Sequence, residues 1–148
     1  MRTLAIDFGG RRVGLALSDQ GGRFASPYEV LFISSPEQAA ERILAIIAKE
    51  GVERLVVGLP LNMDETMGPA ARETIRFARD LAGRAGKPLV FVDERLTSFA
   101  AEQQLADRKR AGEKLTHKRK KQQQDAVAAC IFLQAFLDGK LLPVDVSR

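Results

Sequence analysis

The stretch Ile6-Asp7-Phe8-Gly9-Gly10-Arg11-Arg12-Val13-Gly14 decides the fold of this chain, because it joins two apolar segments through a tight turn. Residues 3–8 and 13–18 are short apolar runs, which predicts two strands paired as a hairpin. Asp7 places a carboxylate in an otherwise apolar strand, where burial without a partner is costly. Two functions are open at this hairpin: a metal ion held by Asp7 and other carboxylates, or a nucleotide phosphate cradled by the glycines.

The remaining segments predict strand–helix–strand units that extend this hairpin. A third strand would complete an antiparallel meander, and the later strands, which alternate with helices, would run parallel to the first. The sequence therefore predicts an α/β fold with one mixed five-stranded sheet and helices on its faces. The expected elements are further strands at 28–33, 54–59 and 89–92, and helices at 36–50, 69–84, 97–109 and 121–138.

The length and composition are typical of one globular domain. The chain has 148 residues, 45% of them apolar and 28% charged, which fits a single domain spanning residues 1–148. It contains no run of about 18 apolar residues, so no transmembrane helix is expected. The single cysteine, Cys130, lies in an apolar helical pattern, which predicts a core side chain and a reducing, cytoplasmic location.

Positive charge is concentrated in one segment. The formal net charge is +4, and residues 107–121 contain eight Lys or Arg against two acids, which leaves 15 basic and 17 acidic residues elsewhere. Such a local excess is typical of a surface that binds a polyanion, although a solvated loop gives the same pattern. The cations expected to contact nucleic acid are Lys118, Arg119, Lys120 and Lys121.

Carboxylates interrupt the apolar elements at three places. Asp7 lies near the end of the first strand, Asp93 and Glu94 follow the apolar run 89–92, and Asp125 begins the apolar face of the last helix. If the first strand lies beside the later parallel strands, the acids share the carboxyl edge of the sheet, where open α/β sheets place their sites. Convergent carboxylates repel one another without a countercharge. They therefore predict a site for Mg²⁺ or Mn²⁺, of the kind that supports phosphodiester hydrolysis.

Each acid also has a purely structural interpretation. Asp7 could accept backbone hydrogen bonds from the glycine turn, and Asp93 or Glu94 could pair with Arg95. Asp125 could stabilise the exposed start of a helix through the helix dipole. Taken together with the neighbouring basic segment, the acids favour the metal site.

Four motifs resemble the YqgF family, also called RuvX. This family is described as Holliday junction resolvases and as nucleases that mature the 5′ end of pre-16S ribosomal RNA. The resemblance spans nearly the whole chain in the right order, and the last three motifs are specific to the family. The motifs are Asp7-Phe8-Gly9-Gly10-Arg11-Arg12-Val13-Gly14-Leu15-Ala16, Val57-Gly58-Leu59-Pro60-Leu61-Asn62-Met63-Asp64, Asp93-Glu94-Arg95-Leu96-Thr97-Ser98, and Lys118-Arg119-Lys120-Lys121 followed by Asp125-Ala126-Val127-Ala128-Ala129.

The resemblance implies an RNase H-like fold in which Asp7, Glu94 and Asp125 are the catalytic acids that bind Mg²⁺ or Mn²⁺. Strand alternation allows only one of Asp93 and Glu94 on the Asp7 side of the sheet. The family pattern favours Glu94, with Asp93 as the second choice. The chain departs from the pattern at Gly10, where the family usually has Thr or Ser and thus a hydroxyl near the metals.

Several residues near these motifs have two interpretations. Arg11 and Arg12 at the hairpin tip could contact phosphate or only solvent. Asn62, in the loop near the site, could contact substrate or stabilise its own turn. His117 is predicted to be a surface residue, and Gly58 is expected to shape the turn from strand to loop.

The predicted function is metal-dependent hydrolysis of structured nucleic acid, in 5′-end processing of pre-16S ribosomal RNA or in Holliday junction resolution. The sequence does not choose between precursor RNA and branched DNA. A two-fold symmetric junction would favour a homodimer. One alternative is a non-catalytic, nucleic-acid-binding ribosome-assembly factor. The other is an actin-like or sugar-kinase-like nucleotide-binding domain, which needs a second domain that 148 residues cannot supply.

Overall fold

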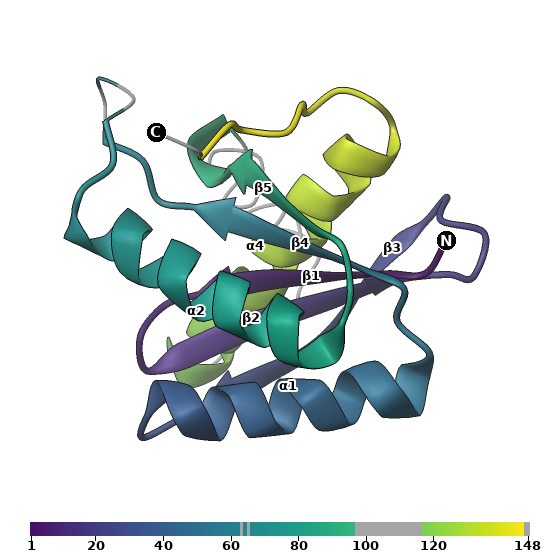
Figure 1. Ribbon diagram of the computed structural model, residues 1–148, viewed down its shortest axis with the longest axis horizontal. Helices are drawn as coiled ribbons and strands as arrows, with labels where there is room; N and C mark the ends of the chain where they lie inside the picture. The colour runs from purple at the N-terminus through teal and green to yellow at the C-terminus, as the bar shows by residue number, and fades with distance from the viewer. Residues whose placement is uncertain (63, 65, 97–116, 147–148) are drawn as a thin grey trace.

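A five-stranded sheet with helices on both faces makes up the part of the chain that the computed structural model describes, residues 1–62, 64, 66–96 and 117–146 (Figure 1). None of the described helices is both long enough and apolar enough to cross a membrane. The helix predicted at 97–109 lies outside the described residues. In chain order the elements are β1 (Thr3–Phe8), β2 (Arg12–Ser18), β3 (Ala25–Phe32), α1 (Pro36–Glu50), β4 (Arg54–Leu59), α2 (Pro69–Ala85), β5 (Leu89–Asp93), the 3₁₀ turn η1 (Glu94–Leu96) and α4 (His117–Leu137).

The β1–β2 hairpin has the tight glycine turn that the sequence predicts. Phe8 pairs with Val13 in an antiparallel register. Gly9 N donates to Arg12 O at 2.8 Å, and a Cβ on Gly9 would lie 2.9 Å from that same oxygen. Gly10 has a φ of +83°, a left-handed conformation that strains residues with a side chain. The turn therefore gives a backbone reason for glycine at position 10.

The strand order is β3-β2-β1-β4-β5, with antiparallel pairing from β3 to β1 and parallel pairing from β1 to β5. This order confirms the predicted mixed sheet and the predicted neighbourhood of the first strand and the later ones. Because β1, β4 and β5 are parallel, their carboxyl ends meet at one edge of the sheet. The acids that follow these strands therefore lie at that edge.

β3 begins at Ala25, three residues before the predicted start at Tyr28. The reason is a contact with α4: Ala25 N donates to Gln134 Oε1 at 2.9 Å, and Gln134 Nε2 donates to Arg23 O at 2.9 Å. This long-range contact outweighs the weak strand propensity of residues 25–27.

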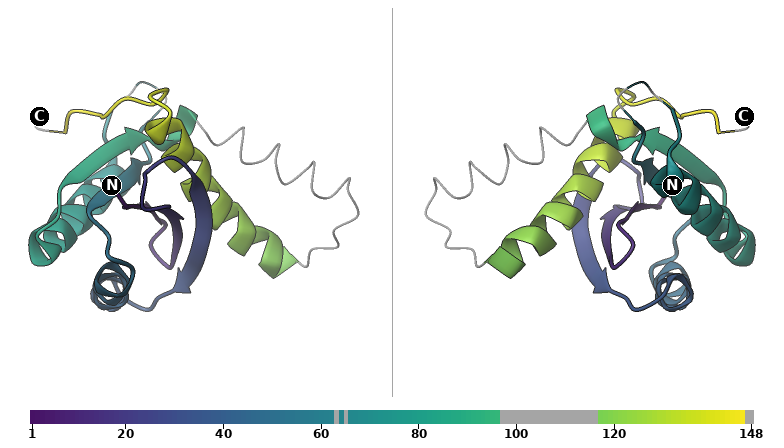
Figure 2. Two further views of the ribbon diagram at one scale, coloured as in Figure 1. Left: turned by 90° about the vertical axis from the view of Figure 1, so that its right-hand side faces the viewer. Right: turned by 90° about the vertical axis from the view of Figure 1, so that its left-hand side faces the viewer.

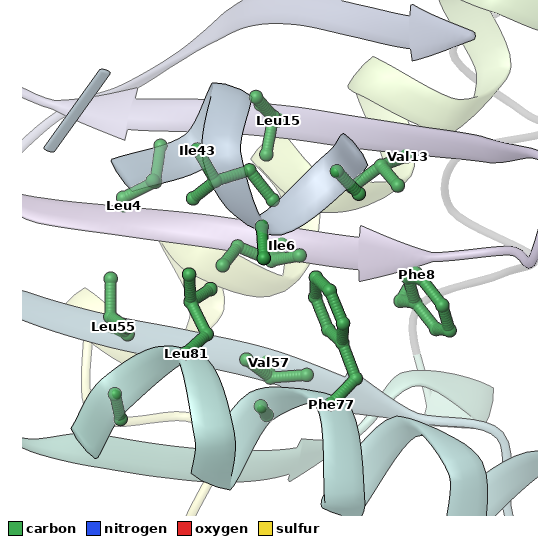
Figure 3. Close-up of a cluster of buried hydrophobic side chains, with 14 of the residues drawn as sticks. Leu4, Ile6, Phe8, Val13, Leu15, Ile43, Leu55, Val57, Phe77 and Leu81 are labelled. Atoms are coloured by element: carbon green, nitrogen blue, oxygen red, sulfur yellow. The ribbon is translucent and has the colours of Figure 1, made fainter. Parts of the chain in front are cut away.

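The face of the sheet that α1 and α2 cover holds the larger hydrophobic cluster (Figure 3). Ile43 of α1 and Leu81 of α2 are fully buried against the strands. The ring of Phe8 in β1 stacks on that of Phe77 in α2, with 4.3 Å between ring centroids. The α1 helix begins after Ser35, whose side chain accepts a hydrogen bond from a backbone N–H of the first turn, as predicted.

The opposite face is covered by α4 (Figure 2). The strands present Ala5, Ala16 and Val56 on this side, and these pack against Phe132 and Leu133 of α4. The small alanines leave room for a helix with large apolar residues to lie close to the sheet.

The α4 helix begins at His117, four residues before the predicted start near Lys121. The prediction was wrong because the run of cations resembles the end of a basic loop, although Lys and Arg are good helix formers. Residues 118–121 therefore lie at the start of a helix, where the helix dipole disfavours positive charge.

The C-terminal segment after α4 returns along the open edge of β5 (Figure 1). Leu141 is buried, and Val144 N donates to Phe91 O at 2.7 Å. The Nη2 atom of Arg79 in α2 donates to Val146 O at 3.2 Å. This segment, residues 141–146, covers the edge of β5 and connects it to α2, and is called the C-terminal tail below.

Candidate active site

Asp7 lies on the α4 face of the sheet, near the carboxyl end of β1. Along β1, Ala5 packs beneath α4 whereas Ile6 is part of the cluster on the opposite face. Because successive side chains of a strand alternate between faces, Asp7 is on the same side as Ala5. The residue is half-buried, so its carboxylate lies in a partly desolvated position.

Glu94 lies over Gly58 of β4, on this same face. Gly58 extends the parallel β1–β4 register by one residue and so neighbours Asp7 on the adjacent strand. A Cβ on Gly58 would lie 2.9 Å from Glu94 Oε2 and 2.9 Å from Phe132 Cε2 of α4. The structure thus brings Asp7 and Glu94 together on one face of the sheet, beneath α4.

Asp93 belongs to the other face by strand alternation and is paired with Arg95. Arg95 Nη2 lies 2.6 Å from Asp93 Oδ2, and Arg95 N donates to Asp93 Oδ1 at 3.0 Å. The hydrogen-bonded guanidinium lowers the pKa of Asp93 below its usual value, against the opposing effect of burial. Of the two interpretations that the sequence left open for Asp93, the structure shows the ion pair with Arg95.

Arg95 also holds the loop that follows β4. Its Nη1 atom donates to Asn62 O at 2.5 Å. Asn62 Nδ2 donates to Thr66 Oγ1 at 3.0 Å, and Asn62 N donates to Thr66 O at 3.0 Å. The Thr66 hydroxyl in turn donates to Asp64 Oδ1 at 2.6 Å. These bonds confirm the turn-stabilising role of Asn62, whereas its contact with substrate stays a prediction.

Asp125, the third predicted acid, lies in the first half of α4. It precedes Ala129, which is buried against the sheet, by one helical turn, and Phe132 by about two. The helix that carries position 125 is therefore the one that covers Asp7 and Glu94. The side chains of Asp125, Lys118, Arg119, Lys120 and Lys121 lie outside the described part of the structure.

Asp7 and Glu94 have the chemistry of ligands for a divalent metal ion. Among the side chains that the structure describes, no three Asp, Glu, His or Cys residues surround a common point. Asp7 and Glu94 offer carboxylate oxygens, the donors that Mg²⁺ and Mn²⁺ prefer. Asp93 adds little to this donor set, because both of its oxygens interact with Arg95. The pair fits a divalent ion that takes its further ligands from a third carboxylate or from substrate.

Arg11 and Arg12 lie at the hairpin tip, beyond the carboxyl end of β1. Arg11 is exposed, and its carbonyl oxygen accepts a hydrogen bond from Ile33 N at 3.0 Å. Arg12 is half-buried at the start of β2. The hairpin thus places two cations at the same edge of the sheet as Asp7, while their contact with phosphate stays a prediction.

Gly58 is a site position whose role the sequence analysis missed. The sequence suggests only that it shapes a turn, whereas the structure shows that it leaves room for Glu94 and Phe132. The signal was available, because glycine inside a buried strand marks the close approach of another group.

Comparison with known proteins identifies relatives over nearly the whole chain. The model of the RuvX family, described as "Holliday junction resolvase", matches residues 1–139. A protein of Chloroflexus aurantiacus named "Putative pre-16S rRNA nuclease" is 42% identical over 137 residues, which cover 93% of this chain and 86% of that protein. A protein of the same name from Geobacillus thermodenitrificans is 39% identical over 144 residues, 95% of this chain and 99% of that one.

A solved structure shares the fold. The Thermus thermophilus RuvC structure superimposes with a TM-score of 0.61 and covers 97% of this chain and 100% of its own, at 18% sequence identity. A second structure, of the same RuvC in complex with a Holliday junction substrate, gives a TM-score of 0.60 at 17% identity, with 97% and 99% of the two chains covered. At this identity the likeness shows the fold alone, which agrees with the RNase H-like fold that the family resemblance implies.

Proposed function

Because this chain belongs to the RuvX family, we propose that it is a nuclease that hydrolyses a phosphodiester bond at the 5′ end of pre-16S ribosomal RNA. The observation that carries the proposal is the placement of Asp7 and Glu94 over neighbouring strands on one face of the sheet. The substrate is suggested by the names of relatives that match nearly the full length of this chain. The whole chain, residues 1–148, acts as one nuclease domain in the cytoplasm.

Asp7, Glu94 and Asp125 are the residues that would hold the catalytic ions. When bound, Mg²⁺ or Mn²⁺ activates water as the nucleophile and stabilises the oxygen that leaves the phosphorus atom. The contribution of this chain is orientation. Gly58 and Phe132 lie against Glu94, whose side chain is on the same face of the sheet as Asp7.

The neighbouring ion pair supports the same geometry from the other side of the strand. Asp93 and Arg95 flank Glu94 in sequence and are locked to each other by several hydrogen bonds. Arg95 also anchors the loop after β4 through Asn62 O. We assign Asp93 and Arg95 as positioning residues, which hold the backbone on both sides of Glu94.

Basic residues would hold the phosphate backbone over this site. They are Arg11 and Arg12 at the hairpin tip and Lys118, Arg119, Lys120 and Lys121 near the start of α4. Cations at a helix start oppose the helix dipole, and a bound polyanion would offset that cost.

Holliday junction resolution is the second candidate, because the family description names this activity. A four-way junction has two-fold symmetry, so its resolution would need two copies of the chain arranged as a homodimer. Cleavage of a precursor RNA has no such requirement.

The experiment that tests the proposal compares three substrates with the same purified protein. They are a precursor RNA that carries the 16S 5′ end, a plain duplex and a four-way DNA junction, each with Mn²⁺ and with Mg²⁺. The Asp7→Asn protein is the control, because it keeps the fold and the basic residues but loses one carboxylate. Metal-dependent cleavage of precursor RNA by wild type and not by Asp7→Asn, with binding preserved in both, supports the proposal.

The other outcomes separate the alternatives. Cleavage of the junction alone would replace the RNA proposal with resolution. Tight RNA binding without cleavage under any metal condition would instead indicate a non-catalytic ribosome-assembly factor. Equal activity of the wild-type and Asp7→Asn proteins would contradict the assignment of the acids.

A further inference from the structure

The outward face of α2 carries three arginines that the candidate active site does not include. Arg72, Arg76 and Arg79 are exposed and stand at intervals of four and three residues, so they form one stripe along the helix. They line a groove of about 740 Å³ between α2, the loop after β4 and the C-terminal tail. We name this feature the arginine groove.

The arginine groove combines cations with an apolar floor. Met67, Ile75 and Val146 line it together with the three arginines. Ile75 is buried, whereas Met67 and Val146 are half-buried. No acid is among the described residues that line the groove. Its chemistry is thus suited to a ligand with negative charges on one side and apolar or flat groups on the other.

The stripe concentrates like charge, which costs free energy when nothing compensates it. On the same helix, Arg84 behaves differently: it pairs with Glu37 at 3.1 Å and with Asp80 at 3.5 Å. Within the described part of the chain, no ion pair of Arg72 or Arg76 is found. Asp80 of α2 thus pairs with Arg84 on the α1 side of the helix, whereas Arg72, Arg76 and Arg79 line the groove as cations.

The groove is connected to the candidate active site through one loop. Thr66 and Met67 form its wall at the start of α2, and Thr66 is hydrogen-bonded to Asn62. Asn62 O accepts a hydrogen bond from Arg95, the neighbour of Glu94. The Thr66 end of the groove therefore lies at the carboxyl edge of the sheet on the α2 side, whereas Asp7 and Glu94 lie at the same edge on the α4 side.

We propose that the arginine groove binds the phosphate backbone of a single-stranded segment that flanks the cleaved bond. The stripe spans about 10 Å along the helix axis, so its arginines can contact more than one phosphate of the same strand. A single strand can lay its unpaired bases on the apolar floor, whereas the bases of a duplex are paired and turned away from the protein. This inference rests on the proposed nuclease function, because it extends the substrate contact of that site.

The test uses the full-length Arg72→Gln/Arg76→Gln double variant, which leaves Arg79 in place to hold the tail. Two RNA probes are compared: the cleavable duplex region alone, and the same region with a 12-nucleotide single-stranded flank. The double variant is expected to bind the flanked probe about tenfold more weakly and to reduce its salt slope by about 1.4, or 0.7 for each lost phosphate contact on a single strand. Binding and cleavage of the probe without the flank should not change.

The matched control is Arg84→Gln, which removes a cation from the same helix on its other side and should leave both probes unaffected. Circular dichroism melting shows whether each variant is folded. If wild type and the double variant bind the flanked probe with equal affinity and equal salt slope, the arginine groove does not bind the flank, even if the enzyme is active. If no substrate is cleaved but the double variant still binds the flanked probe more weakly than wild type, the nuclease function is wrong and the RNA-binding role of the groove is retained.

Discussion

Replacing Gly58 by alanine would put a methyl group 2.9 Å from Glu94 Oε2 and 2.9 Å from Phe132 Cε2. Both neighbours would have to move, and Glu94 is the more flexible of the two. A displacement of a catalytic group by about 1 Å can cost about 100-fold in rate. We therefore expect Gly58→Ala to lose about two orders of magnitude of metal-dependent cleavage, measured under single-turnover conditions, while circular dichroism shows a folded protein.

Gly83 offers a matched control for this substitution. It lies in α2, and a Cβ built on it meets no atom within 4 Å. Gly83→Ala should keep full activity and stabilise the helix by about 0.5–1 kcal/mol. Full activity in Gly58→Ala would show that Glu94 does not need the position that the structure gives it.

Asp93 makes a pH-dependent contribution to stability through Arg95. Its pKa is lowered in the folded protein, chiefly by the hydrogen bond from the Arg95 side chain, so the pair stabilises the fold above the ordinary carboxyl pKa of about 4. That stabilisation is lost as the pH falls through the folded-state pKa. Asp93→Asn should therefore cost about 1–3 kcal/mol of unfolding free energy at pH 7, as measured by urea denaturation.

The difference between wild type and Asp93→Asn should shrink when the same denaturation is repeated near pH 3. The pKa of Asp64 is also lowered, chiefly by hydrogen bonds from Thr66 in an exposed loop. Because wild type and Asp93→Asn both contain Asp64, its titration cancels when the two proteins are compared. A difference between wild type and Asp93→Asn that does not change with pH would mean that the Asp93–Arg95 ion pair does not stabilise the fold.

The cations at the start of α4 are expected to lower the stability of the fold while they increase the affinity for RNA. Replacing Lys118, Arg119, Lys120 and Lys121 by Ala removes four cations from the positive end of the helix dipole, each worth about 0.3–1 kcal/mol, and Ala is also the best helix former. The variant should therefore melt at a higher temperature than wild type. It should nevertheless bind precursor RNA more weakly, with a flatter dependence of affinity on salt.

A second four-cation variant separates local from overall charge. Arg42, Lys49, Lys87 and Lys140 lie on other elements or their ends, and their replacement by Ala changes the net charge by the same amount. It should bind RNA nearly as wild type does. An equal loss of affinity in both variants would show that overall charge, rather than the start of α4, attracts the RNA.

Elements bounded by clear signals could be predicted from the sequence. The apolar run 54–59 and the helix between Ser35 and Gly51 are found as predicted, because Pro60 follows the run and Ser35 and Gly51 cap the helix. The starts of β3 and α4 were not predicted correctly. At β3 the bonds of Gln134 come from a helix about 110 residues later, and local propensity contains no information about such a contact.

The site was predictable in part for similar reasons. Strand alternation limits Asp93 and Glu94 to opposite faces, but the sequence alone does not say which face α4 covers. The packing of Ala5 beneath Phe132 decides it, and so places Glu94 with Asp7. The arginine groove was beyond prediction, because its far wall is the C-terminal tail, whose position depends on the finished sheet.

At the scale of the whole molecule, the C-terminal tail protects one edge of the sheet. Leu141 is 5% exposed, and Val144 N donates to Phe91 O at 2.7 Å. Removal of residues 141–148 should expose the edge of β5, which invites pairing with other chains, and should cost about 2 kcal/mol or more from Leu141 alone. We expect a lower melting temperature and concentration-dependent light scattering. A melting curve equal to wild type would mean that the tail is not part of the folded core.

The central claim is that Asp7 and Glu94, rather than Asp93, hold the catalytic ions. A calorimetric titration of Mn²⁺ into wild type, Glu94→Gln and Asp93→Asn tests it most directly, because the two variants each lose one carboxylate at adjacent positions. We predict that Glu94→Gln loses at least tenfold in Mn²⁺ affinity, whereas Asp93→Asn, which only loosens the backbone beside Glu94, loses several-fold less than Glu94→Gln. Loss of binding in Asp93→Asn, with binding retained in Glu94→Gln, would contradict the account.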